Sequence, residues 1–179
     1  MSKFYFWLWL SWSLRLTLTS VGLALILSLL ITLILYIKQG MAGLTSEVIE
    51  ALLQVMLFWF PLAWGLTLLL SLFTSLKYIF NTRKNRYELK LYECSSQEMI
   101  EEIGYGDIVK VWRKWFMAMI WLVGVEMIIS LFLTYALSLY ENVFEWFNIY
   151  ILFTYILSAG YISFILLAGR CKKVKLRKC

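Results

Sequence analysis

The stretch LTLTSVGLALILSLLITLILY, residues Leu16 to Tyr36, decides the fold class of this protein. It contains no charged residue and no proline. A helix needs about 20 mainly apolar residues to cross the roughly 30 Å of a bilayer's hydrocarbon core. The stretch therefore predicts a transmembrane helix.

Three further stretches have the same character: Leu52 to Leu76, Trp115 to Leu137 and Val143 to Ala168. Of the 179 residues, 62% are hydrophobic and 16% are charged, whereas a soluble domain is about half apolar and about a quarter charged. The sequence predicts an all-α integral membrane protein. We expect a bundle of four transmembrane helices that forms one membrane domain over residues 1–179.

Lysine and arginine residues indicate the orientation, because the cytoplasmic flanks of transmembrane helices carry an excess of both. Of the 17 such residues, only Lys38 falls in a segment expected on the outer side. The other sixteen lie before the first helix or at its start, in the central loop of residues 77–114, and in the tail after the fourth helix. This distribution predicts a cytoplasmic position for both termini and the loop, and we expect a bacterial inner membrane.

The tail of residues 170–179 carries a dense cluster of positive charge just beyond the last helix. Basic residues at this position gain about 1 kcal/mol each near an anionic leaflet. We interpret the cluster as a contact with anionic lipid headgroups rather than with nucleic acid, and an acidic protein partner is the alternative. Its members are Arg170, Lys172, Lys173, Lys175, Arg177 and Lys178.

The N-terminal residues 4–14 are rich in aromatic side chains, including three tryptophans between Phe4 and Trp12. Such amphipathic rings settle at the level of lipid headgroups. The segment therefore predicts either a separate interfacial helix or the lower end of an overlong first helix. At the start of the second helix, we expect Thr45 or Ser46 to be the N-cap.

The central loop has the pattern of a small folded structure. Tyr87, Leu89 and Leu91 alternate with polar residues, which predicts a short strand. Ser95 and Glu98 fit a capping box at the start of a short helix. We therefore expect residues 77–114 to be ordered and to offer a surface to partner proteins.

The loop ends in Ile103-Gly104-Tyr105-Gly106-Asp107, which resembles the selectivity filter of potassium channels, where backbone carbonyls replace an ion's hydration shell. A filter also requires a preceding threonine, whereas Glu101 and Glu102 stand before this segment. We interpret the glycines as a turn between helices. Asp107 is expected to cap the third helix, which would run from Ile108 to Leu139 if it is continuous.

Glu126 is the one acidic residue near the middle of a predicted span. Burial without a basic partner disfavours the charged form, so we expect a neutral, hydrogen-bonded carboxyl group. Ser130 and Thr134 follow at four-residue steps and would share its helix face. The sequence thus predicts an intramembrane polar site of Glu126, Ser130 and Thr134 with partners at similar depth in other helices. The candidate partners are Trp64, Thr67, Tyr155 and Ser158.

Two further features concern helix packing. Pro61, the only proline, lies inside the second span and is expected to kink it. Small residues recur at four-residue steps in each span, and such rows let membrane helices approach closely. The rows are Ser20, Ala24, Ser28 and Thr32; Ala63, Thr67, Ser71 and Ser75; Ser130, Thr134 and Ser138; and Thr154 and Ser158 beside Gly160.

The composition also limits the function. There is no histidine, and the three cysteines never form a CxxC pair, which argues against a histidine-based triad, a haem ligated by histidine or an ordinary zinc site. We expect no enzyme activity, no cofactor and no metal. The leading interpretation is an accessory or scaffold subunit that docks partner proteins, or copies of itself, through its bundle surface or its loop. The alternative is a small proton- or cation-coupled transporter or channel that uses Glu126.

Overall fold

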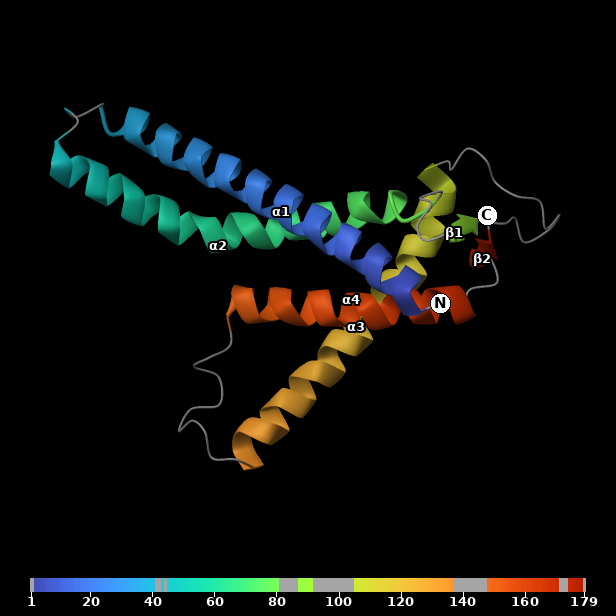
Figure 1. The fold of residues 1–179 in the computed structure, drawn as a ribbon. Helices are drawn as coiled ribbons and strands as arrows, with labels where there is room; N and C mark the ends of the chain where they lie inside the picture. Colours follow the sequence, from blue (N-terminus) through green and yellow to red (C-terminus); the bar gives the residue numbers. More distant parts are fainter. Residues whose placement is uncertain are drawn as a thin grey trace. The chain divides into compact units, whose positions relative to one another are not determined.

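The computed structural model describes residues 2–40, 43, 45–80, 87–91, 105–136, 148–170 and 174–178. Over these residues the chain forms four helices, and each contains a segment long and apolar enough to span a membrane, as predicted. In chain order the elements are α1 (Ser2–Lys38), α2 (Ser46–Lys77), β1 (Tyr87–Leu91), α3 (Tyr105–Ala136), α4 (Ile149–Arg170) and β2 (Val174–Lys178) (Figure 1).

The chain divides into two compact units. One unit is Leu14–Ser75, which holds most of α1 and α2. The other joins Met1–Ser13 to Leu76–Cys179. The first turns of α1 therefore belong to the same unit as α3, α4 and the two strands.

Helix α1 has 37 residues, or about 55 Å at 1.5 Å per residue. Of the two predictions for the aromatic N-terminus, the second is confirmed, because residues 4–14 continue the first helix. The prediction that Asp107 caps the third helix is wrong, since α3 begins at Tyr105 and includes Asp107 in its first turn. The same start places Tyr105 and Gly106 in helical rather than extended backbone, unlike a selectivity filter.

The other ends of the helices follow local capping rules. Thr45 caps α2 as predicted, because its hydroxyl accepts a hydrogen bond from the Val48 amide at 3.4 Å. Asn148 caps α4, and its Oδ1 accepts from the amides of Tyr150 and Ile151 at 3.0 and 3.1 Å. Helix α2 continues without a break through Pro61. The predicted helix with Ser95 and Glu98 at its start, the turn residue Gly104 and the first residues of the predicted fourth span, 143–147, lie outside the described part of the chain.

In the unit of α1 and α2, the two rows of small residues meet at Ser20 and Thr67, where the Thr67 hydroxyl donates to the Ser20 carbonyl oxygen. The rows Ser20, Ala24, Ser28, Thr32 and Ala63, Thr67, Ser71, Ser75 are all buried, as expected of a helix contact. The row predicted for α4 is only partly correct. Gly160 is buried there, but Thr154 and Ser158 are exposed, and the buried face of α4 runs instead through Phe153, Ile156, Ala159, Ser163, Phe164 and Leu167.

The second unit is built around an aromatic core. Trp12 of α1 meets the Phe164 ring edge to face at 5.1 Å between centroids, and Trp115 of α3 stacks on the same ring at 6.1 Å. All three side chains are buried. The Trp115 indole N–H donates to Ser163 Oγ at 2.8 Å, so its one polar atom is satisfied. Aromatic pairs of this geometry stabilise a fold by about 0.5–1.5 kcal/mol each beyond their area burial.

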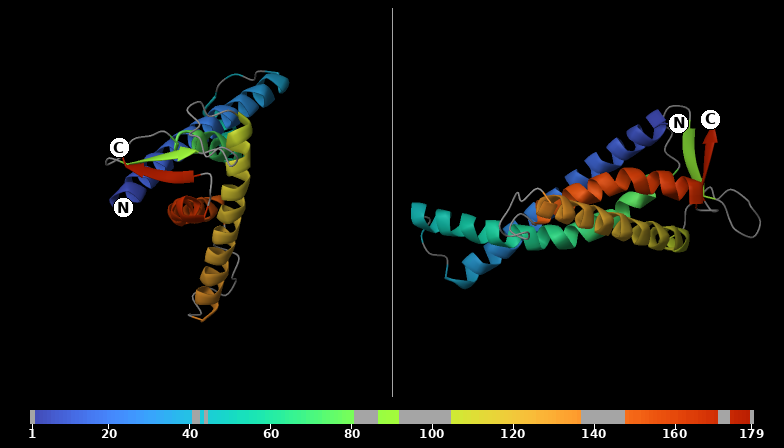
Figure 2. Two further views of the ribbon diagram at one scale, coloured as in Figure 1. Left: turned by 90° about the vertical axis from the view of Figure 1, so that its right-hand side faces the viewer. Right: turned by 90° about the horizontal axis from the view of Figure 1, so that it is seen from below.

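A two-stranded antiparallel sheet completes this unit. Strand β1 lies beside β2 (Figure 2). The register places Tyr87 opposite Lys178 and Leu91 opposite Val174. The predicted strand at residues 87–91 is confirmed. Its partner is the basic tail, for which the sequence predicted a contact with lipid headgroups or an acidic protein and not a strand. Leu89 is fully buried, so β1 is anchored to the unit by at least one side chain.

Candidate functional site

The strongest candidate for a functional site is the pair Glu126 and Ser158, which joins α3 to α4. The Ser158 hydroxyl donates a hydrogen bond to Oε2 of Glu126, with 2.6 Å between the two oxygen atoms. The same hydroxyl lies 3.0 Å from the carbonyl oxygen of Tyr155. Glu126 is half-buried and Ser158 is exposed, so the pair lies at the surface of its unit.

The packing of α3 against α4 explains why this acid and this serine meet. Glu126 lies ten residues before Ala136, the last residue of α3, and Ser158 lies near the middle of α4. Helices α3 and α4 pack against each other in one unit. Ser158 was one of four candidate partners for Glu126, and it is the one whose side chain bonds to the carboxyl group.

The other members of the predicted polar site have different partners. Ser130 is half-buried, and its carbonyl oxygen accepts from the Thr134 hydroxyl at 2.8 Å within α3. The Thr134 side chain is buried. These two residues share a helix with Glu126, but the hydrogen bond between them satisfies Thr134 locally.

Trp64 and Thr67 belong to the other unit, where both contact Ser20. The Trp64 indole N–H donates to Ser20 Oγ at 3.2 Å, and the Thr67 hydroxyl lies 3.0 Å from the Ser20 carbonyl oxygen. Ser20 is fully buried. These contacts form a polar link between α1 and α2. They also satisfy Trp64 and Thr67 without an acid.

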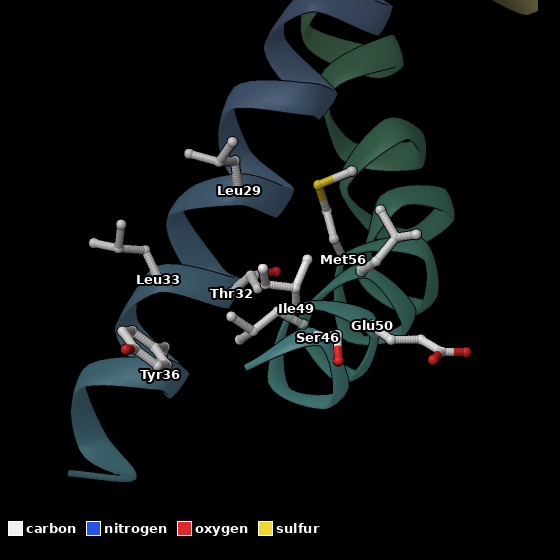
Figure 3. Close-up of a pocket in the computed structure, with 10 residues that line it drawn as sticks. Leu29, Thr32, Leu33, Tyr36, Ser46, Ile49, Glu50 and Met56 are labelled. Carbon is white, nitrogen blue, oxygen red and sulfur yellow. The ribbon is translucent and has the colours of Figure 1, made fainter. Parts of the chain in front are cut away.

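An apolar groove between α1 and α2 was missed in the sequence analysis. Its volume is about 580 Å³, and Figure 3 shows its walls. The walls come from the last three turns of α1 and the first three turns of α2: Leu29, Thr32, Leu33, Tyr36, Ser46, Ile49, Glu50, Leu52, Leu53 and Met56. No single stretch of sequence signals such a groove, because it exists only once two helices lie side by side.

The strand pairing of the tail was also missed, although the sequence holds a signal for it. In Val174-Lys175-Leu176-Arg177, apolar and basic residues alternate, which is the period of a strand. The register places Arg177 opposite Glu88. Of the six predicted lipid-contact residues, Arg170 is the last residue of α4, and Lys175, Arg177 and Lys178 lie in β2.

The molecule was compared with known proteins at three levels. No family model, no curated protein and no solved structure matches this chain.

Proposed function

We propose that this protein is a non-enzymatic integral membrane subunit that assembles with a partner transmembrane helix through the Glu126–Ser158 pair. The observation that carries the proposal is the position of a carboxyl group at a helix surface inside a candidate membrane span. A scaffold or accessory role in the inner membrane is part of the same proposal. Transport through Glu126 is the competing function.

The surroundings of the pair favour a protein partner. Val125 and Ile129 are exposed apolar neighbours of Glu126 on α3, and Ile162 is exposed one turn after Ser158 on α4. A carboxyl group on such a surface would face hydrocarbon if nothing covered it. Polar groups at that depth are costly and usually face another helix or a water-filled cavity. A second helix that covers the pair removes this cost.

The chemistry of the pair defines what the partner must supply. Oε2 of Glu126 accepts from Ser158, and no other hydrogen bond to this carboxyl occurs within the described residues. The partner helix should therefore bring a donor, such as a serine, asparagine, tryptophan or lysine side chain, to the depth of Glu126. Hydrogen bonds between membrane helices contribute about 0.6–2 kcal/mol each, so a single pair adjusts affinity and register rather than creating the whole interface.

The groove between α1 and α2 does not favour transport through Glu126, because the acid is not among its lining residues. The loop and tail support the docking proposal in a different way. Strands β1 and β2 form a small sheet on the side that the distribution of basic residues predicts to be cytoplasmic. That sheet gives a partner a folded surface rather than a loose linker.

The test is purification of the full chain from its native membrane in a mild detergent, followed by a mass measurement of the complex by light scattering. We expect a stable complex, with copies of this chain or with another protein in fixed ratio. Glu126→Leu should weaken it, and Glu126→Gln should retain it, because glutamine can still accept from Ser158.

Thr154→Ala is the matched control, since Thr154 is an exposed α4 residue whose hydroxyl bonds to the Tyr150 carbonyl of its own helix at 3.0 Å. It should leave the complex intact. A monomeric wild-type protein, or a complex equally stable in Glu126→Leu, would rule out the proposal. Proton-linked flux that is lost in a normally assembled Glu126→Gln protein would put transport in its place.

A further inference from the structure

We infer that the groove between α1 and α2 holds one acyl chain of a phospholipid whose headgroup carries a primary amine. The groove lies wholly within the unit Leu14–Ser75, and both of its walls are helices apolar enough to span a membrane. The groove contains neither Glu126 nor Ser158, so a test of lipid binding there is independent of a test of the proposed function.

The lining of the groove changes along its length. Its deep part is apolar and includes Leu29, Leu33, Leu53 and Met56. Apart from Thr32, the polar side chains lie where the helices approach their connection, with Tyr36 near the end of α1 and Ser46 and Glu50 at the start of α2 (Figure 3). From Leu29 to Tyr36 the α1 wall is about 10 Å long at 1.5 Å per residue. The groove thus has the layout of a lipid, with hydrocarbon at one end and polar groups at the other.

The shape of the walls favours an acyl chain over a protein helix. Membrane helices associate closely through small residues, but this groove is lined mainly by large ones such as Leu33, Ile49 and Leu53. The small residues of this stretch, Ser28 and Thr32, are already buried. A flexible chain can follow an irregular apolar surface that a rigid helix would leave partly empty, and empty space forfeits dispersion contacts.

The charge at the polar end selects the headgroup. Glu50 is the one charged residue of the lining, and its side chain is exposed. It would repel the net charge of an anionic lipid and attract an ammonium group. A primary ammonium has three donors, as in lysine, and can bond to the Glu50 carboxylate, whereas a quaternary ammonium offers no N–H. The groove should therefore prefer phosphatidylethanolamine to phosphatidylcholine and phosphatidylglycerol.

The experiment uses the full-length protein in nanodiscs that contain equal amounts of these three lipids. Native mass spectrometry after release into detergent counts the lipids that stay bound. We expect one tightly held phosphatidylethanolamine, preferred by about threefold over phosphatidylcholine, as an exposed charge pair would give. Equal retention of the three lipids by the wild-type protein would overturn the inference.

Two variants locate the lipid, and each has a matched control. Leu53→Trp fills the groove and should abolish the tightly held lipid, while Leu57→Trp, at an exposed position one turn along α2 that does not line the groove, should keep it. Glu50→Gln should keep a bound lipid but lose the threefold preference. Glu47→Gln removes an acid that does not line the groove and should keep the preference. Retention of the preferred lipid in Leu53→Trp, or loss of the preference in both acid variants alike, would also overturn the inference.

Discussion

Gly160 of α4 lies directly against the Trp12 ring of α1, and a Cβ atom at Gly160 would overlap that ring, with Cη2 of the indole only 2.8 Å away. Trp12 also makes edge-to-face contacts with the rings of Trp115 and Phe164. The ring therefore has little room to move. Helices α1 and α4 can approach this closely in their unit because Gly160 has no Cβ atom.

Gly160→Ala should accordingly destabilise the protein, by about 1–3 kcal/mol, as overpacking of a filled core does. The measurement is thermal unfolding in detergent, followed by circular dichroism. Gly124→Ala is the control, because a Cβ at Gly124 meets nothing within 4 Å; it should not destabilise the protein, and the higher helix propensity of alanine should stabilise it by up to about 1 kcal/mol. Equal effects of the two substitutions would mean that α1 does not pack on α4 as described.

Ser163→Ala should also be costly, because it removes the acceptor of the buried Trp115 N–H. A buried donor left unsatisfied costs about 1–3 kcal/mol. Trp115→Phe removes the donor as well, so the double variant Trp115→Phe, Ser163→Ala should be less destabilised than the sum of the two single variants. A double-mutant cycle measures this coupling, and strict additivity would contradict the hydrogen bond.

Glu126→Leu should have a small effect on the free energy of unfolding of the isolated chain, about 1 kcal/mol or less. The reason is that Ser158 can still donate to the Tyr155 carbonyl, so no buried donor loses its only partner. Thr67, another candidate partner from the sequence, bonds to carbonyl oxygens of Ser20 and Ala63 instead. A large loss of stability in Glu126→Leu would show that the acid holds the fold together rather than an interface.

The predicted topology can be checked with reporter fusions placed after Gly40, Cys94, Glu141 and Cys179. We expect the four positions to alternate between outside, inside, outside and inside, because only Lys38 among the basic residues falls in a segment predicted to be outside. As a control, each position carries in turn a reporter that is active only outside the membrane and one that is active only inside, and the two should give opposite signals. A reporter after Cys94 that is found outside would contradict the predicted cytoplasmic position of the central loop.

Removal of the residues from Val174 onward should expose β1, because β2 is its antiparallel partner. Amide exchange at Leu89 and its neighbours should then accelerate towards that of an unpaired strand. Leu176→Ala keeps the backbone and is the control, since it should leave exchange in β1 nearly unchanged. Unaltered protection of β1 after the truncation would mean that the parallel bridge from Phe80 to Leu89 suffices to hold it.

The parts of the fold that sequence predicts well are those encoded locally. The span Leu16–Tyr36 is a run of neighbouring apolar residues, the strand at residues 87–91 is an alternation over five positions, and Thr45 stands next to the helix that it caps. Each of these depends on residues that are adjacent in the chain. The start of α3 was misplaced because two glycines suggested a turn, whereas the helix already includes Gly106.

The parts that sequence does not predict depend on which segments meet. Glu126 had several possible partners of suitable depth, and the choice of Ser158 follows from the packing of α3 on α4. Strand β1 pairs with a segment more than eighty positions away. The alternation in each segment predicts a strand but does not indicate which segment is its partner. The groove is lined by residues of both α1 and α2, so the sequence pattern of neither helix alone predicts it.

The hydrogen bond from the Trp9 indole to the Leu157 carbonyl joins residues 148 positions apart. During synthesis the first turns of α1 leave the ribosome long before their partners on α4 are made. The unit Leu14–Ser75 has all its residues as soon as α2 is complete. Assembly of the chain is therefore staged, because the aromatic side chains at the start of α1 can contact α4 only after α4 has been made. Contacts between residues so far apart in the sequence form slowly.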